Sequence, residues 1–351
     1  MIEFKPVLNL FHYINPIFLI LPRLGIMKHY LITGGAGFIG GNLIRTLFEN
    51  EPGIKITCID NFDPFYNVEI KNFNISPFMD NPRFRLLKKD LAQTGSKELT
   101  TLIGEPVDTI VHLAAKAGVR PSILNPLAYQ YANVIGLQHL LDYAKENNIR
   151  QFVFASSSSV YGINDHFPWK EDEQLLPISP YASTKLSGEM QGHVYSRLFG
   201  IRFLALRFFT VYGPGQRPDL AIHKFTRNIL AGDPIPVYGD GSTSRDYTFV
   251  GDTVQGIIGA MNYDKTNFEI INLGNNYTIS LKDLIAAIED VIGKKAIIER
   301  QPDQAGDVPK TFADISKAKM LLGYNPQTKL KDGLKKFYEW FTAHRELLIR
   351  Q

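Results

Sequence analysis

The stretch YLITGGAGFIGGNLIRTLFEN, residues 30–50, decides the fold: an apolar run, a glycine-rich turn and a helical run follow one another. Gly34, Gly37 and Gly40 recur at every third position. Glycine permits a tight strand-to-helix turn and lets the backbone approach a pyrophosphate, which then lies on the positive end of the helix. The stretch therefore predicts the first strand–turn–helix unit of a dinucleotide-binding sheet.

The next apolar run, IKITCID (54–60), ends in a carboxylate, which stands where a dinucleotide-binding sheet would bind the adenosine ribose. Asp60 follows Gly40 by twenty residues. At this separation a carboxylate hydrogen-bonds a ribose diol, and it would repel the 2′-phosphate of NADP. We therefore predict NAD as the cofactor; a tight turn that binds no nucleotide is the alternative. The further predicted cofactor contacts are Phe38, Ile39, Asn61, Asp90, Leu91, Ala114 and Ala115.

Apolar runs of strand length alternate with helical stretches up to residue 208. Runs that are apolar on both faces are typical of strands in a parallel sheet, which is covered on both sides. The alternation predicts a doubly wound, Rossmann-type α/β sheet over residues 27–208. Its predicted strands are 28–33, 54–60, 83–90, 108–114, 151–156 and 202–208, and its predicted helices are 38–49, 127–147 and 180–199.

The pattern changes after residue 209. Gly and Pro become frequent, and the predicted helices at 280–292, 314–322 and 329–345 are irregularly spaced. We expect 209–351 to form mainly a smaller, substrate-binding C-terminal lobe, although the chain can cross between the lobes more than once. Residues 1–26 are predicted to be an extension, or a start misplaced ahead of Met27.

The composition indicates which classes of partner are not expected. Lys and Arg number 38 against 35 Asp and Glu, and they are scattered, so no nucleic-acid partner is predicted. The single cysteine, Cys58, excludes an internal disulfide and fits a reducing compartment, so we expect a cytoplasmic location. The run INPIFLILP is shorter than the roughly 20 residues that cross a bilayer, and no membrane partner is predicted. No histidine shows ligand spacing, and no metal is predicted.

The segment SPYASTK (179–185) places a tyrosine and a lysine on one helix face. Tyr181 and Lys185 stand at i and i+4 after a predicted strand, downstream of the dinucleotide fingerprint. A nearby ammonium and a positive nicotinamide would lower the tyrosine pKa from its usual value of about 10, which makes the phenol a usable base. A tyrosine packed on a neighbouring helix, with a solvated lysine, is the alternative.

Six segments in this order carry a family resemblance: TGGAGFIG, HLAAKAGVR, ASSSSVYG, PYASTK, RFFTVYGPGQRPD and GDGSTSRDYTFVGD. Together they resemble the extended short-chain dehydrogenase/reductase family, and within it the UDP-glucuronate 4-epimerases, from about residue 28 to 340. The resemblance implies that Ser157 hydrogen-bonds the sugar O4 and that Tyr181 takes its proton while the C4 hydride passes to NAD. Lys185 would hold the nicotinamide ribose. The hydride would return to the other face of a 4-keto intermediate.

The serine run supplies hydroxyl groups that could hold the carboxylate of a hexuronate substrate. A 4-keto hexuronate is a β-keto acid, which loses carbon dioxide when its carboxylate bond aligns with the carbonyl π system. Directional donors must hold the carboxylate out of that alignment. The resemblance assigns this task to Ser158, Ser159, Thr210 and Arg217. By the same resemblance, related 4,6-dehydratases carry Asp and Glu at the positions of Ser158 and Ser159. Ser156 is predicted to pack at the strand end.

Other assignments also rest on the resemblance. Arg120 and Arg245 are expected to bind the substrate diphosphate, because guanidinium groups pair well with phosphate, and Asp307 the uridine ribose. Lys116 stands where the family usually has glutamine. A homodimer is implied, built by helices 127–147 and 180–199. Two alternatives stay open: a UDP-glucose or UDP-N-acetylhexosamine 4-epimerase, and a non-catalytic NAD-binding protein.

Overall fold

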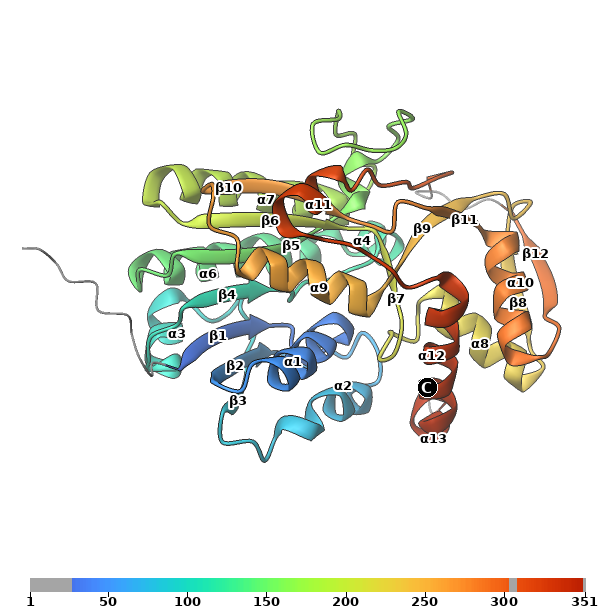
Figure 1. The fold of residues 1–351 in the computed structure, drawn as a ribbon, viewed down its shortest axis with the longest axis horizontal. Coiled ribbons are helices and arrows are strands. Elements are labelled where there is room, and N and C mark those ends of the chain that lie inside the picture. Colours follow the sequence, from blue (N-terminus) through green and yellow to red (C-terminus); the bar gives the residue numbers. More distant parts are fainter. Residues whose placement is uncertain (1–26, 303–307, 350–351) are drawn as a thin grey trace, which may run out of the picture.

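A seven-stranded parallel sheet forms the centre of this computed structural model, which describes residues 27–302 and 308–349 (Figure 1). Its strand order is β10-β6-β5-β4-β1-β2-β3. All six strands predicted from the sequence are present, so the Rossmann-type fold is confirmed. The strands are β1 (Lys28–Thr33), β2 (Ile54–Asp60), β3 (Phe84–Lys88), β4 (Thr109–His112), β5 (Gln151–Ser157), β6 (Arg202–Phe208) and β10 (Phe268–Leu273).

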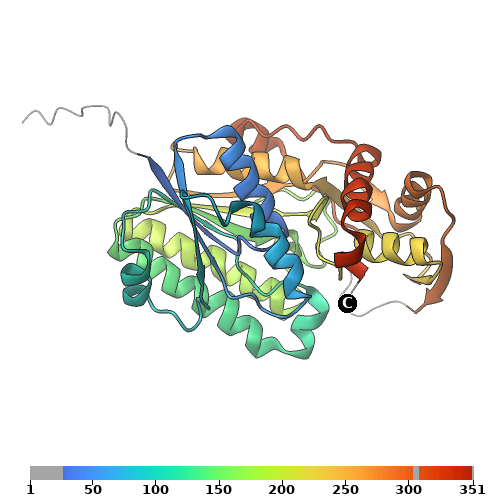
Figure 2. The same cartoon turned by 90° about the horizontal axis from the view of Figure 1, so that it is seen from below.

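Helices cover both faces of this sheet (Figure 2). Successive side chains of a strand point to opposite faces. Ile32 therefore joins the core beneath one layer of helices, and its neighbour Leu31 joins the core beneath the other. One layer holds α1 (Phe38–Asn50), α2 (Val68–Ile75) and α9 (Val250–Met261), and the other holds α3 (Ser96–Ile103), α6 (Gly136–Glu146) and α7 (Pro180–Phe199).

The region of the predicted helix 127–147 is less regular than expected. It consists of α5 (Pro126–Tyr129), a wide π-helical segment (Gln130–Ile135) and then α6, and the short α4 (Val119–Leu124) precedes it. Within the π-helical segment, the side chain of Asn133 donates to the carbonyl oxygen of Lys116 at 3.0 Å and to Thr184 Oγ1 at 2.9 Å. The irregular turn thus ties the loop after β4 to the helix that carries Tyr181.

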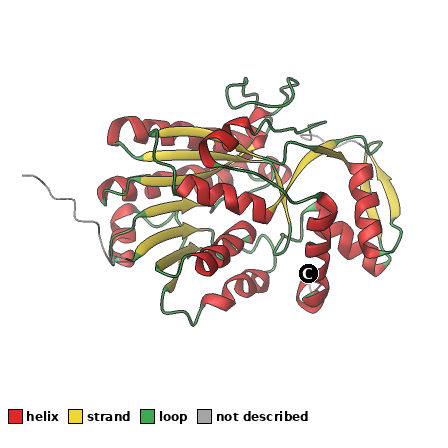
Figure 3. Ribbon diagram, viewed as in Figure 1, coloured by secondary structure: helices red, strands yellow, loops and turns green. Residues whose placement is uncertain are grey.

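The chain after β6 builds a smaller group of elements at one end of the large sheet (Figure 3). It also returns to the large sheet after α9, where β10 pairs with β6. The remaining strands are β7 (Thr210–Tyr212), β8 (Pro234–Tyr238), β9 (Ser244–Phe249), β11 (Thr278–Ser280) and β12 (Ile297–Gln301). The helices of this group are α8 (Ala221–Ala231), α10 (Leu281–Ile292), α12 (Leu330–Ala343) and α13 (Arg345–Ile349), whereas α11 (Ser316–Leu322) packs against β10 and α9. Within the described ranges, no helix has the length and apolar character needed to cross a bilayer.

Candidate active site

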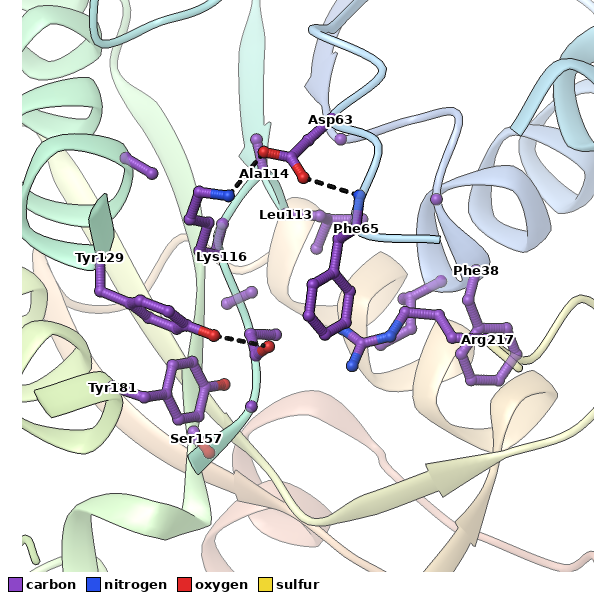
Figure 4. Close-up of a pocket in the computed structure, with 18 of the residues that line it drawn as sticks. Phe38, Asp63, Phe65, Leu113, Ala114, Lys116, Tyr129, Ser157, Tyr181 and Arg217 are labelled. Atoms are coloured by element: carbon purple, nitrogen blue, oxygen red, sulfur yellow. Dashed lines mark hydrogen bonds and ion pairs between the residues drawn. The ribbon is translucent and has the colours of Figure 1, made fainter. Parts of the chain in front are cut away.

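A cavity of about 1070 Å³ opens where strands β1, β2, β4 and β5 end. Open α/β sheets bind ligands in such a crevice, because the loops that follow the strands meet there. Figure 4 shows its floor and walls: Tyr181 and Ser157 lie on one side, and Phe65 and Arg217 on the other. The residues predicted for the cofactor and those predicted for the sugar therefore share one cavity.

The glycine turn leaves no room for side chains where a dinucleotide would approach. Gly34 has a φ of 71°, and a Cβ on it would lie 2.6 Å from a backbone nitrogen of the loop after β4. A Cβ on Gly40 would collide with the turn itself. Gly37 precedes α1 without any side-chain cap, so first-turn N–H groups remain for a ligand, and Phe38 and Ile39 line the cavity. This cradle fits the pyrophosphate of NAD.

Asp60 shapes the turn as well as lining the cavity. Its carboxylate accepts hydrogen bonds from the backbone N–H groups of Ala36 at 3.1 Å and Phe62 at 2.9 Å. Beside it, Asn61 Nδ2 donates to Asp90 Oδ2 at 3.0 Å. The predicted adenosine contacts therefore form one polar end of the cavity. The other predicted cofactor contacts in its lining are Leu91, Ala114 and Ala115.

The start of α7 places the predicted base and its lysine on the cavity wall. Ser179 caps the first turn with a 3.2 Å hydrogen bond, as the sequence predicts. Lys185 is buried, and its Nζ donates to the carbonyl oxygen of Ala155 at 2.6 Å. Burial lowers the pKa of Lys185 to about 7.

The phenol of Tyr181 differs from the expectation. Burial raises its pKa, while a hydrogen bond from the Ser157 hydroxyl and the charge of Arg217 act in the opposite direction. Lys185 is not among the groups that lower this pKa, and its Nζ donates to Ala155. The positive nicotinamide that NAD would bring is the remaining predicted influence that lowers it.

All four serines line the cavity, and Ser156 also has a buried structural partner. Ser156 donates to Glu189 Oε1 at 2.5 Å, which agrees with its predicted packing role. The chain then leaves β5 in a 3₁₀ turn (Ser158–Tyr161), where the Ser159 N–H donates to Ser157 Oγ at 3.2 Å. Because of this turn, Ser157, Ser158 and Ser159 all line the cavity.

Two residues from the C-terminal half complete the wall. Thr210, the first residue of β7, and Arg217 both line the cavity. The guanidinium carbon of Arg217 lies 5.4 Å from the centre of the Phe65 ring. A guanidinium thus stands across the cavity from Tyr181 (Figure 4).

Two predicted substrate contacts, Arg120 and Arg245, are not part of the cavity lining. Arg120 is exposed and its guanidinium lies 5.1 Å from the ring centre of Tyr238. Arg245 Nη1 donates to the carbonyl oxygen of Ser244 at 2.9 Å. Asp307 lies outside the described residues, as does the predicted extension 1–26. The diphosphate and uridine assignments therefore stay predictions.

The loop after β2 and helix α2 contribute contacts that the sequence did not predict. Asp63 forms an ion pair with Lys116 at 2.6 Å (Figure 4). The buried Lys71 lines the cavity with its Nζ 3.8 Å from Asp60 Oδ1. The acidic and aromatic segment DNFDPFYN was visible in the sequence, but no spacing rule connects it to Lys116, which lies on another strand end.

Comparison with known proteins agrees with this geometry. The model of the family described as GDP-mannose 4,6 dehydratase matches residues 31–337. The chain is 42% identical over 324 residues to an uncharacterised protein of Methanocaldococcus jannaschii, covering 92% of this chain and 99% of that protein. It is 36% identical over 325 residues to the UDP-glucuronate 4-epimerase of Thermodesulfobacterium geofontis, covering 92% and 98%.

Solved structures give the same result. The crystal structure of UDP-glucuronic acid 4-epimerase from Bacillus cereus, in complex with UDP-glucuronic acid and NAD, superposes with a TM-score of 0.85 at 36% identity, covering 90% of this chain and 99% of that one. A UDP-N-acetylglucosamine 4-epimerase from Methanobrevibacter ruminantium superposes with a TM-score of 0.82 at 31% identity, covering 90% and 99%. The chain therefore belongs to the GDP-mannose 4,6 dehydratase family of extended short-chain dehydrogenases/reductases.

Proposed function

We propose that this chain is an NAD-dependent UDP-glucuronate 4-epimerase, which interconverts UDP-glucuronate and UDP-galacturonate through a 4-keto intermediate. One observation carries the proposal: Tyr181, the hydroxyls of residues 157–159 and Arg217 line the same cavity as the glycine turn. A base, hydroxyl donors and a guanidinium thus surround the space beside the cofactor cradle. The relatives named UDP-glucuronate 4-epimerase support the same substrate.

The residues divide the chemistry between them. When bound, NAD accepts the C4 hydride and returns it. The glycine turn would hold its pyrophosphate, and Asp60 its adenosine ribose. Tyr181 would take the proton of the sugar O4, to which Ser157 would also hydrogen-bond. Because burial raises the pKa of Tyr181, the phenol gives up its proton at neutral pH only beside a positive charge. This requirement links deprotonation to the oxidised cofactor.

The carboxylate of the sugar is held by a separate group of donors. Ser158, Ser159, Thr210 and Arg217 all line the cavity. Four donors that converge on one carboxylate fix its plane, and a fixed plane keeps the bond to the carboxylate out of line with the 4-keto group. The 4-keto intermediate is thereby retained as a six-carbon acid until the hydride returns.

The family description names a dehydratase, and the serine run argues against that activity here. Dehydration at C5 and C6 needs a side chain that gives and takes protons near neutral pH. Ser158 and Ser159 are hydroxyls, whose protons are held far too tightly for this role. The family membership therefore fixes the fold and cofactor class, and the site residues select the reaction.

Purified protein incubated with UDP-glucuronate is expected to form UDP-galacturonate, measured by anion-exchange chromatography. Tyr181→Phe is expected to lower kcat by roughly 10²- to 10⁴-fold, because it removes the base but keeps the ring. Bound NAD in both preparations shows that the variant keeps its cofactor site. Conversion of UDP-glucose or UDP-N-acetylglucosamine, with none of UDP-glucuronate, would instead establish the neutral-sugar epimerase.

We further propose that the enzyme is a cytoplasmic homodimer. On α7, Met190, Val194 and Leu198 repeat every four residues and are exposed. The preceding helical segments add exposed apolar side chains at Leu124 and Leu127. Monomeric proteins rarely expose apolar patches of this kind, so a second copy is the occupant that symmetry favours. The single cysteine supports the reducing compartment.

A further inference from the structure

Asp219 holds the guanidinium of Arg217 through two parallel hydrogen bonds. Arg217 Nε donates to Asp219 Oδ1 at 3.0 Å, and Nη2 donates to Oδ2 at 2.7 Å. Arg217 lines the cavity, whereas Asp219 is not part of the lining. The Asp219 carboxylate therefore binds the guanidinium on the side that faces away from the cavity. Two-point pairing fixes the plane of the group as well as its position.

The remaining donors of Arg217 define which edge a ligand meets. A guanidinium carries five N–H donors. Asp219 engages Nε and one Nη2 hydrogen, and among the described residues nothing accepts a hydrogen bond from Nη1. The Phe65 ring lies against the guanidinium, with its centre 5.4 Å from the guanidinium carbon. The edge formed by Nη1 and Nη2 is thus left for an acceptor of planar, two-oxygen geometry.

The backbone beneath Arg217 is held from two other elements. Asn42 Nδ2, on α1, donates to the carbonyl oxygen of Pro214 at 3.0 Å. His223 Nδ1, on α8, bonds the carbonyl oxygen of Gln216 at 2.9 Å, and His223 is fully buried. With the loop fixed on both sides of Gly215, the direction of the guanidinium depends on its side-chain torsions. Asp219 is the ionic partner that sets them.

We propose that Asp219 is a positioning residue that makes Arg217 bind the substrate carboxylate in one orientation, which selects hexuronates and prevents loss of carbon dioxide. The inference rests on the proposed function. In the unwanted reaction the C5–C6 bond breaks, carbon dioxide leaves, and the electron pair forms the enolate of a 4-keto pentose, which is then protonated at C5. A guanidinium that turns freely would follow the carboxylate into the aligned geometry. A guanidinium held by Asp219 resists that rotation.

Asp219→Asn tests the inference, with Asp290→Asn as the matched control. Asp290 pairs with Lys331 at 2.6 Å on the exposed surface and does not line the cavity, so its variant also removes one aspartate–cation pair. For Asp219→Asn we expect KM for UDP-glucuronate to rise about tenfold, the effect of losing one charge-assisted hydrogen bond, with kcat little changed. The share of UDP-pentose among the products is expected to rise severalfold. Bound NAD and UDP affinity should match the control.

Asp219→Glu separates orientation from charge. It keeps the negative charge but moves the carboxylate by one methylene, so the pentose share is expected to rise here too. Wild-type behaviour of Asp219→Glu, a lower KM in Asp219→Asn, or a pentose share equal to that of Asp290→Asn would each overturn the positioning role. If the unsubstituted protein leaves UDP-glucuronate unchanged, the proposed function itself fails, and the inference fails with it.

Discussion

Lys185 is a buried base whose environment opposes its charge. Burial lowers its pKa from 10.5 to about 7, although the charge of Glu189 acts in the opposite direction and the Nζ donates to the Ala155 carbonyl oxygen. Between pH 7 and about 10, an unfolded chain keeps this proton while the folded chain has released it. The free energy of unfolding therefore rises with pH over this window, because the unfolded state binds more protons.

This sign gives a test on protein freed of NAD. Urea unfolding at pH 7, 8 and 9 should show the free energy of unfolding of the wild type rising relative to that of Lys185→Met, which lacks the titrating group. Below pH 7 the difference between the two proteins should stay constant, since both states of the wild type are then protonated. Parallel curves across the whole range would contradict the buried, neutral lysine.

Side-chain partners show the limit of sequence reasoning at this scale. The i, i+4 spacing correctly put Tyr181 and Lys185 on one face, because helix geometry fixes which residues share a face. It did not show that Lys185 would donate to Ala155, a contact across to β5. Ser156 was predicted to pack, but its partner Glu189 was not predicted. Glu189 also forms a fully buried ion pair with Arg207 at 2.8 Å. These three residues lie on β5, α7 and β6, so local sequence does not indicate their contacts.

Helix α7 approaches the sheet closely through glycine. A Cβ on Gly192 would collide with the ring of Phe203. That ring stacks on Phe152 with centroids 5.1 Å apart, so it has no room to move aside. Gly192→Ala is expected to destabilise the fold by about 1–3 kcal/mol, despite the better helix propensity of alanine.

Denaturant unfolding checks this expectation, with Gly53→Ala as the control. A Cβ on Gly53 would meet no atom within 4 Å. Its substitution should change the free energy of unfolding by no more than about 0.5 kcal/mol. Equal stability of the two variants would show that helix α7 can move away from the sheet and accommodate the added methyl group at Gly192.

Elements were predictable where local pattern decides them. Strands apolar on both faces and the glycine turn gave six strands and the first helix, because burial from both sides leaves a continuous signal. The run FEIINL of β10 has the same character, but its pairing with β6 is long-range. Irregular geometry was also missed: nothing in local propensity marks the π-helical turn at Gln130–Ile135, which forms around the contacts of Asn133.

At the scale of the molecule, a buried carboxylate joins segments far apart in the sequence. Asp246, on β9, accepts hydrogen bonds from the backbone N–H groups of Asn275 at 2.6 Å, Asn276 at 3.1 Å and Ala313 at 3.2 Å. These segments pack the C-terminal half against the large sheet. Sequence patterns cannot reveal such a centre, because the donors are backbone groups that any residue carries.

The proposed dimer gives the last prediction, because its face lies opposite the face of α7 that packs on the sheet. Gly188 and Gly192 face the core, whereas Val194 and Leu198 are exposed. The double variant Val194→Glu, Leu198→Glu should elute as a monomer in size-exclusion chromatography with light scattering, because four buried charges would oppose association. Met320→Glu, at an exposed apolar position on α11, should keep the wild-type mass. A double variant that stays dimeric would place the contact between copies elsewhere.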